Sequence, residues 1–392
     1  MMIPRLRVMK PTLRILAFLL VLVVAFTLAA APLVAANGEK DREVEMGKEA
    51  AKEVEKDAKM VSDPAIRERV ERIGKAITEV ANSVEVPAEY GDSKIVRFDY
   101  TFKVIEDKDA NAFSLPGGYI YINSGLLDFI QSDSELAGVL AHEVAHASHH
   151  HMVKLLKEQA RLNNQIAIGL LVAIVSKMPQ RDINNAILGM QLYRTAKTSG
   201  YGQKAEVDAD QTAAVYLSKT EYSPVGLLTF IERLARKPEV VTLGIFQTHP
   251  PSRERAKWII EQIEKLNIPI NRRAVTRAIK AESRAVDVDG QSYPAIFLDD
   301  KALYRVAAKD GQTAEERATA LAKAINQALD ADIQLRDVKL GNGPVVMAKN
   351  EPLITVTDAD AAINGRSAAD IAAEMVNAIK KVVWKEQIDQ LY

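Results

Sequence analysis

The chain has 392 residues, of which 48% are hydrophobic, and its 51 basic residues are balanced by 52 acidic residues. This length suffices for two or three domains with large cores, and the even balance of charge excludes a strong overall attraction to nucleic acid or to anionic membranes. The absence of cysteine excludes disulfides, thiolate metal ligands and a lipid anchor on a processed N-terminal cysteine.

The first 36 residues have the pattern of a secretory signal peptide. Four basic residues between positions 5 and 14 precede an uncharged, mostly apolar run over residues 15–36, which ends in small residues. Cleavage after Ala36 predicts a periplasmic or secreted protein. The alternative is an uncleaved anchor in the inner membrane, because the run is long enough to span a bilayer. Membrane contact is expected only in that case.

Helical periodicity follows in residues 39–80, where Asp63-Pro64 predicts the start of a second helix. Residues 95–104 alternate between apolar and polar side chains and predict a strand. A Pro-Gly-Gly turn at residues 116–118 then precedes an aromatic, β-branched run, which predicts a hairpin.

Residues 142–146 have the sequence His-Glu-Val-Ala-His, in a segment with helical periodicity that Ser132 or Ser134 can cap. Two histidines four positions apart lie on one helix face, where both can reach one Zn²⁺. Glu143 between them can hold a water and take its proton. His142 and His146 are therefore candidate ligands and Glu143 a candidate base, with a solvated helix face as the alternative for an isolated motif. His149 and His150 are expected at a polar helix end, with a second, adventitious metal site as the alternative.

The unbroken apolar run over residues 166–175 is too short to span a membrane and predicts a buried helix; a lid or a hydrophobic substrate wall is the alternative. A largely helical pattern follows over residues 186–216. It contains Glu206 and Asp210, which share a helix face. A catalytic zinc needs a third protein ligand, and Glu206 is the best candidate, since one of these carboxylates can bind metal while the other accepts a ligand histidine's N–H. A solvated acidic face is the alternative.

Helical patterns continue over residues 224–235 and 253–266, separated by a His-Pro-Pro loop that contains His249. Beyond residue 271 the pattern changes. Two stretches, 286–298 and 333–356, predict β-structure, and two others, 313–329 and 367–383, predict amphipathic helices. This predicts a C-terminal α+β domain over residues 284–386, in which the sequence contains no evident catalytic constellation.

Several motifs, in this order, resemble the BepA/LoiP/HtpX-like zinc metallopeptidases of the gluzincin class, over roughly residues 39–266. The motifs are Asn111-Ala112-Phe113 with Pro116-Gly117-Gly118, Gly125-Leu126-Leu127, Glu135-Leu136-Ala137, the 142–146 motif, Glu206 to Asp210, and His249-Pro250-Pro251-Ser252 with Arg255. The secretory start resembles the periplasmic BepA-type branch. Two features depart from that pattern: Gly202-Gln203 stand where the family often has Ser-Arg, and no helical repeats follow.

The resemblance implies one Zn²⁺ per chain with three protein ligands: His142, His146 and Glu206. Glu143 would then be the general base, and Asp210 would support a ligand histidine. His249 would either stabilise the oxyanion or occupy the fourth metal position and keep the enzyme latent, with a capped loop histidine as the alternative. Arg255 would anchor the His249 loop by pairing with a carboxylate.

The resemblance also implies that Asn111, Ala112 and Phe113 line the cleft and pair with an extended substrate. The predicted fold class is α+β: a mostly helical zincin-type metalloprotease domain with a small β-sheet over residues 39–268, followed by the small domain at 284–386. The expected function is a metalloendopeptidase that cleaves misfolded or stalled envelope proteins, with an envelope protein as candidate partner of the C-terminal domain. The alternative is a periplasmic chaperone or adaptor with a latent or structural zinc site.

Overall fold

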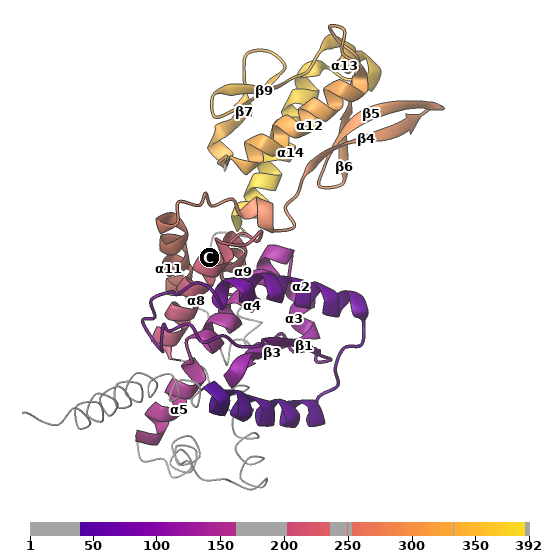
Figure 1. Ribbon diagram of the computed structural model, residues 1–392. Coiled ribbons are helices and arrows are strands. Elements are labelled where there is room, and N and C mark those ends of the chain that lie inside the picture. The colour runs from indigo at the N-terminus through magenta and orange to yellow at the C-terminus, as the bar shows by residue number, and fades with distance from the viewer. Residues whose placement is uncertain (1–39, 162–201, 236–248, 250–252, 332, 389–392) are drawn as a thin grey trace, which may run out of the picture. The chain divides into compact units, whose positions relative to one another are not determined.

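The computed structural model describes residues 40–161, 202–235, 249, 253–331 and 333–388 (Figure 1). The predicted signal segment and the apolar run at 166–175 lie outside these residues. No helix in the described part of the chain is long and apolar enough to cross a membrane. The architecture is α+β, as predicted, and the described chain forms two compact units. The first holds residues 40–126, 142–161, 202–212 and 249, and the second holds residues 127–141, 213–235, 253–331 and 333–388.

Two helices begin the first unit. Residues 40–57 form one helix, and α2 (Pro64–Ala81) follows where Asp63-Pro64 predicts it. The Asp63 side chain caps α2 by accepting the backbone N–H of Ala65 at 2.9 Å. The apolar stripe of α2 is buried, which confirms the predicted periodicity.

The strand predicted over residues 95–104 is wrong in its first half, because β1 is Thr101–Ile105. Phe98 is buried, but its backbone N–H and C=O both bond to the side-chain amide of Asn82, each at 3.1 Å. The Asn82 amide therefore satisfies backbone groups that would otherwise need a neighbouring strand.

The predicted hairpin is present: β2 (Ala112–Leu115) and β3 (Tyr119–Asn123) are joined by a 3₁₀ turn, Pro116–Gly118. Gly117 and Gly118 have φ angles of 75° and 91°, where only glycine avoids a steric cost. β3 pairs antiparallel with β2 and parallel with β1, so the sheet order is β1-β3-β2. The sheet shares a core with the 40–57 helix, α5 (His151–Arg161) and the first turn of α8 (Gln203–Leu217).

The second unit contains α9 (Val225–Ala235) and α11 (Arg253–Lys265), both where the sequence predicts helices. The 3₁₀ turn Arg272–Val275 follows. The remaining elements are β4 (Ala281–Val288), β5 (Gln291–Leu298), β6 (Lys301–Arg305), α12 (Ala314–Asp330), β7 (Val338–Leu340), β8 (Val345–Ala348), β9 (Glu351–Thr355), α13 (Asp358–Asn364) and α14 (Ala368–Ile388). The strands among them form two antiparallel sheets, β4-β5-β6 and β7-β8-β9.

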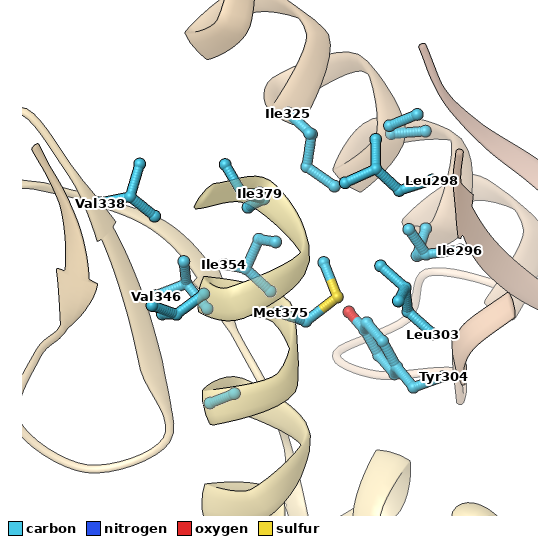
Figure 2. Close-up of a cluster of buried hydrophobic side chains, with 14 of the residues drawn as sticks. Ile296, Leu298, Leu303, Tyr304, Ile325, Val338, Val346, Ile354, Met375 and Ile379 are labelled. Carbon is cyan, nitrogen blue, oxygen red and sulfur yellow. The ribbon is translucent and has the colours of Figure 1, made fainter. Parts of the chain in front are cut away.

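The core of this C-terminal region lies between its two sheets. α14 contacts β7 and β8 of one sheet and β6 of the other (Figure 1). Figure 2 shows Met375 and Ile379 on this helix, with Val346 on one side and Leu303 and Tyr304 on the other. All five side chains are buried in one cluster. α12 contacts β4, β5 and β9, so two helices cover the apolar faces of the sheets, and α14 contacts strands of both.

Candidate metal centre

The 142–146 motif lies on α4 (Asp133–Ser148), a helix that is buried on all sides. Its apolar residues include Leu136, Leu140 and Val144, and none of these is exposed. The motif's polar side chains are nearly as buried: His142 is 5% exposed, and Glu143 and His146 are each 1% exposed. Such a helix holds its polar side chains in fixed positions within the protein interior.

Four potential ligands from three segments meet at this helix: His142, His146, Glu206 and His249. The Nε2 atoms of His142 and His146 are 3.0 Å apart. Glu206, in the first turn of α8, places Oε2 3.5 Å from His142 Nε2 and Oε1 3.5 Å from His146 Nε2. His249 Nδ1 lies 3.2 Å from His142 Nε2 and 3.0 Å from a Glu206 oxygen. The structure therefore brings the three predicted ligands together, and it places His249, the predicted candidate for the fourth metal position, beside them.

These four side chains fit zinc. Tetrahedral zinc with ligands at 2.0–2.1 Å has ligand atoms about 3.3 Å from one another, close to the separations observed here. Imidazole nitrogen and carboxylate oxygen are both zinc ligands, and no thiolate is needed. Glu143 adds a second indication, since its buried Oε2 has no hydrogen-bond partner among the described residues, while its Oε1 lies 3.3 Å from His249 Nε2.

Asp210 lies beside Nδ1 of His142, the ring nitrogen that does not face the ligand cluster. His142 Nδ1 lies 2.9 Å from an oxygen of the buried Asp210 carboxylate, and a proton on this Nδ1 would leave the Nε2 lone pair facing the cluster. Burial opposes protonation of His142, but hydrogen bonds to Asp210 and Glu206 outweigh it and raise the pKa of His142 to about 9. A bound cation opposes that protonation, because a ligand histidine must be neutral.

A second buried network begins on the other side of His146. His151 Nδ1 lies 2.8 Å from His146 Nδ1, and His151 Nε2 lies 3.0 Å from Asp208 Oδ2 and 2.8 Å from the Tyr90 carbonyl. His149 Nδ1 reaches the same Asp208 oxygen at 2.6 Å. His149 lies directly after the end of α4, as predicted, but its side chain is 2% exposed and bonded to a buried carboxylate.

The protonation of this network follows from its burial and contacts. Burial lowers the pKa of His151 and holds the pKa of His146 well below its ordinary value, so both are neutral near pH 7. Burial by itself raises the pKa of Asp208, but hydrogen bonds from His149 and His151 outweigh burial and lower this pKa far below the usual range. Asp208 is thus an ionised acceptor.

His150 separates α4 from α5 and has a positive φ of 56°. Its Nδ1 bonds to Glu43 on the 40–57 helix at 2.6 Å. It is only partly buried, and burial opposes its protonation, but the Glu43 contact outweighs burial and raises the pKa of His150. His150 thus fits the predicted polar helix end better than His149 does. Its left-handed backbone also makes the turn between α4 and α5.

The predicted substrate strand is buried at the edge of the first unit's sheet. Asn111, Ala112 and Phe113 are at most 3% exposed, and Phe113 stacks on Tyr121 with ring centroids 5.3 Å apart. Among the described strands, β2 pairs with β3 on one side only. Any pairing with an extended substrate would therefore use the backbone of β2 and not its side chains.

Arg255 lies in α11 and is 3% exposed. Burial of a guanidinium requires polar or charged neighbours, which agrees with an anchoring role. The particular pairing with a carboxylate near the site stays a prediction.

A buried ion pair that the sequence analysis did not predict holds the first turn of α4. Glu135 is fully buried and binds Arg233 of α9 through two hydrogen bonds of 2.6 and 2.7 Å. It also accepts the hydroxyl of Thr229 at 3.0 Å and the backbone N–H of Gln131 at 2.7 Å. The Glu135-Leu136-Ala137 motif marks the position, but nothing in the sequence indicates a partner 98 residues away.

Comparison with known proteins places the site within a family region. A profile of peptidase family M48 matches residues 67–263, which include all four potential ligands. A second family, described as a domain of unknown function, matches residues 294–386. The two matches are separate along the chain.

Three curated relatives come from Escherichia coli (strain K12). The chain is 26% identical to the beta-barrel assembly-enhancing protease over 217 residues, which cover 53% of this chain and 41% of that protein. It is 31% identical to metalloprotease LoiP over 208 residues, which cover 52% of this chain and 80% of LoiP. It is 27% identical to metalloprotease YcaL over 207 residues, which cover 53% of this chain and 76% of YcaL. The chain thus spans about two fifths of the beta-barrel assembly-enhancing protease and most of the two shorter relatives.

Proposed function

Because the chain belongs to peptidase family M48, we propose that it is a zinc-dependent endopeptidase of the cell envelope. In this proposal His142, His146 and Glu206 hold one zinc ion, and Glu143 is the general base. Asp210 keeps His142 in the tautomer that presents Nε2 to the metal. The relatives named metalloprotease support the reaction class.

The position of Glu143 is the observation that carries the proposal. Its carboxylate is buried, lies beside the four-residue cluster, and has one oxygen without a hydrogen-bond partner among the described residues. Burial of such an oxygen costs free energy. A structural zinc site has no use for this carboxylate, whereas a hydrolytic site needs a base there.

The chemistry assigned to the chain is proton transfer at a buried site. When bound, zinc polarises the scissile carbonyl and lowers the pKa of a coordinated water toward about 7. Glu143 takes a proton from the attacking water and delivers it to the leaving amine. Burial of Glu143 and of the histidines around it excludes bulk water and strengthens these interactions.

His249 is proposed to occupy the fourth metal position and to hold the site latent. Its Nδ1 is as close to His142 Nε2 and to Glu206 as the predicted ligands are to one another. A substrate carbonyl would then need His249 to move away. Once displaced, His249 could stabilise the developing negative charge on the carbonyl oxygen.

Unfolded or extended proteins are the proposed substrates, and the backbone of β2 is the proposed docking edge. The name of one relative refers to assembly of β-barrels, which supports substrates among envelope proteins. We place the chain in the periplasm, with residues 1–36 as a cleaved signal. An envelope protein is the proposed partner of the C-terminal domain at 284–386. The mass of the mature N-terminus tests the cleavage.

The decisive experiment measures zinc content and casein cleavage on the same preparations. Glu143→Gln should keep one zinc per chain and lose cleavage by roughly 10²–10⁴-fold, the usual contribution of a general base. Glu85→Gln, the same change at an exposed position of the first unit, is the matched control and should cleave normally. Glu206→Gln should lose zinc, and unchanged zinc content would remove Glu206 from the ligand set.

The second candidate function is a chaperone or adaptor whose zinc site stays closed, and the close approach of His249 to the cluster favours it. His249→Ala separates the two candidates. Increased cleavage in this variant supports a latent protease. Bound zinc with no cleavage in the wild type, in Glu143→Gln and in His249→Ala would rule out the protease and leave the chaperone.

A further inference from the structure

His151 reaches the metal centre because the helix before it is interrupted. In a continuous helix, a residue five positions after His146 lies about 140° around the axis, away from its neighbour. Here α4 ends at Ser148, and His150 adopts a left-handed conformation, with φ of 56°. The turn brings His151 back, so that its Nδ1 lies 2.8 Å from His146 Nδ1.

The hydrogen bonds of this network allow one arrangement of protons when His146 binds metal. His146 must present the Nε2 lone pair to the ligand cluster, so its proton is on Nδ1. That N–H then donates to Nδ1 of His151, which must be unprotonated at this atom. His151 therefore carries its proton on Nε2, where it faces two acceptors, Asp208 Oδ2 at 3.0 Å and the Tyr90 carbonyl at 2.8 Å.

Asp208 is held in place as the last member of this chain. Its Oδ1 accepts the backbone N–H groups of Glu89 and Tyr90, the latter at 3.3 Å. Its Oδ2 accepts His149 Nδ1–H at 2.6 Å as well as His151. A carboxylate with this many donors is fixed and ionised, and it can orient the imidazole of His151.

We propose that His151 is a positioning residue for the metal centre, which fixes the tautomer and ring orientation of His146 and transmits to it the field of the Asp208 carboxylate. The inference rests on the proposed zinc function. The two helical ligands then differ in support: His142 contacts its carboxylate, Asp210, directly, whereas His146 reaches one through a neutral imidazole. Outer contacts of this kind commonly set ligand basicity and metal affinity.

A second metal ion held by His149, His151 and Asp208 is the competing explanation for this cluster. The geometry argues against it. The 2.6 Å separation between His149 Nδ1 and Asp208 Oδ2 is short for two ligands of one zinc ion, which lie about 3.3 Å apart, and is normal for a charge-assisted hydrogen bond. The Tyr90 carbonyl beside His151 Nε2 also requires a proton on that atom.

The test combines zinc affinity with observation of the histidine protons. His151→Phe keeps the ring volume but removes the acceptor, and it should weaken zinc binding about 10- to 100-fold in competition with a fluorescent chelator. His151→Gln retains an acceptor and a donor and should stay within about threefold of wild type. His149→Phe is the matched control: it is equally buried and bonded to Asp208, but it lies outside the path from His146. Because it removes only one donor to Asp208, it should weaken zinc binding less than His151→Phe does.

Nitrogen-15 NMR of histidine-labelled, zinc-loaded wild type gives the second readout, which a merely structural role would not fix. The proposal requires the Nε2–H tautomer of His151 and the Nδ1–H tautomer of His146, and the opposite tautomer of His151 would overturn it. Equal losses of affinity in His151→Phe and His149→Phe, or two zinc ions per wild-type chain, would also overturn it. If His151→Phe does not fold, His151→Gln and the wild-type tautomers still decide. A wild type that binds no zinc refutes the proposed function instead.

Discussion

Loss of Glu135 should destabilise the second unit strongly, because it leaves a buried guanidinium without its carboxylate. The Arg233 side chain is 14% exposed and makes two short bonds to Glu135. In Glu135→Ala it would retain the Phe129 carbonyl at 3.0 Å and the Phe129 ring, with Cζ 4.5 Å from the centroid. Neither contact neutralises its charge.

The expected cost is about 3–5 kcal/mol, the range for breaking one partner of a buried ion pair. The hydroxyl of Thr229 and the backbone N–H of Gln131 lose their acceptor as well, which favours the upper half of this range. With a urea dependence of about 1–3 kcal/mol per molar, the unfolding midpoint should fall by at least about 1 M. Circular dichroism measures the midpoint, and hydrogen exchange in peptides from α4 and α9 shows where protection is lost.

A double-mutant cycle separates charge burial from loss of packing. Glu135→Leu with Arg233→Met removes both charges and should be markedly more stable than the sum of the single changes predicts. Glu282→Ala, in an exposed pair where the Glu282 side chain is 51% exposed, should shift the midpoint little. A Glu135→Ala loss below about 1 kcal/mol, or simple additivity in the cycle, would refute the reasoning.

Two further changes test other parts of the second unit. Burial opposes ionisation of Asp360, but Arg317 and backbone N–H groups outweigh burial and lower the pKa of Asp360. The ionised carboxylate therefore contributes its full stabilisation above about pH 4, and this stabilisation is lost as the pH falls through the lower pKa of the folded state. Hydrogen exchange at pH 6 and pH 3 should show the loss, and Asp360→Asn should abolish the difference between the two pH values. Gly138→Ala would place a Cβ 2.7 Å from the Leu227 Cα and should destabilise by about 1–3 kcal/mol despite the better helix propensity of alanine. The control Gly202→Ala meets no atom of the described residues within 4 Å, and equal midpoints for both variants would contradict the clash.

The metal site was largely predictable because its spacing is local. His142 and His146, like Glu206 and Asp210, are four residues apart on single helices, so helical periodicity alone places each pair on one face. The resemblance to zinc metallopeptidases, which the family match confirms, related the two helices to each other and pointed to His249. The α+β class and most helix starts followed from capping residues and periodicity.

The missed features depend on contacts that no local pattern encodes. His151 meets His146 only because His150 is left-handed, and histidine gives little indication of that conformation. The strand predicted at 95–100 fails because the side chain of Asn82 takes the place of a neighbouring strand. The Glu135 and Arg233 pair, like the contact of Asp208 with the backbone near Tyr90, joins residues about a hundred positions apart.

The place of α14 in the C-terminal region has a consequence for protein synthesis. This helix contacts strands of both three-stranded sheets, yet the ribosome makes it after every strand that it contacts. During translation α12 can cover β4 and β5 as soon as it is made, but the apolar surface that packs on α14 stays uncovered until α14 arrives. Contacts between residues so far apart slow folding and prolong the exposure of sheet edges. Part of the apolar core of this region thus stays exposed until its last helix has been made.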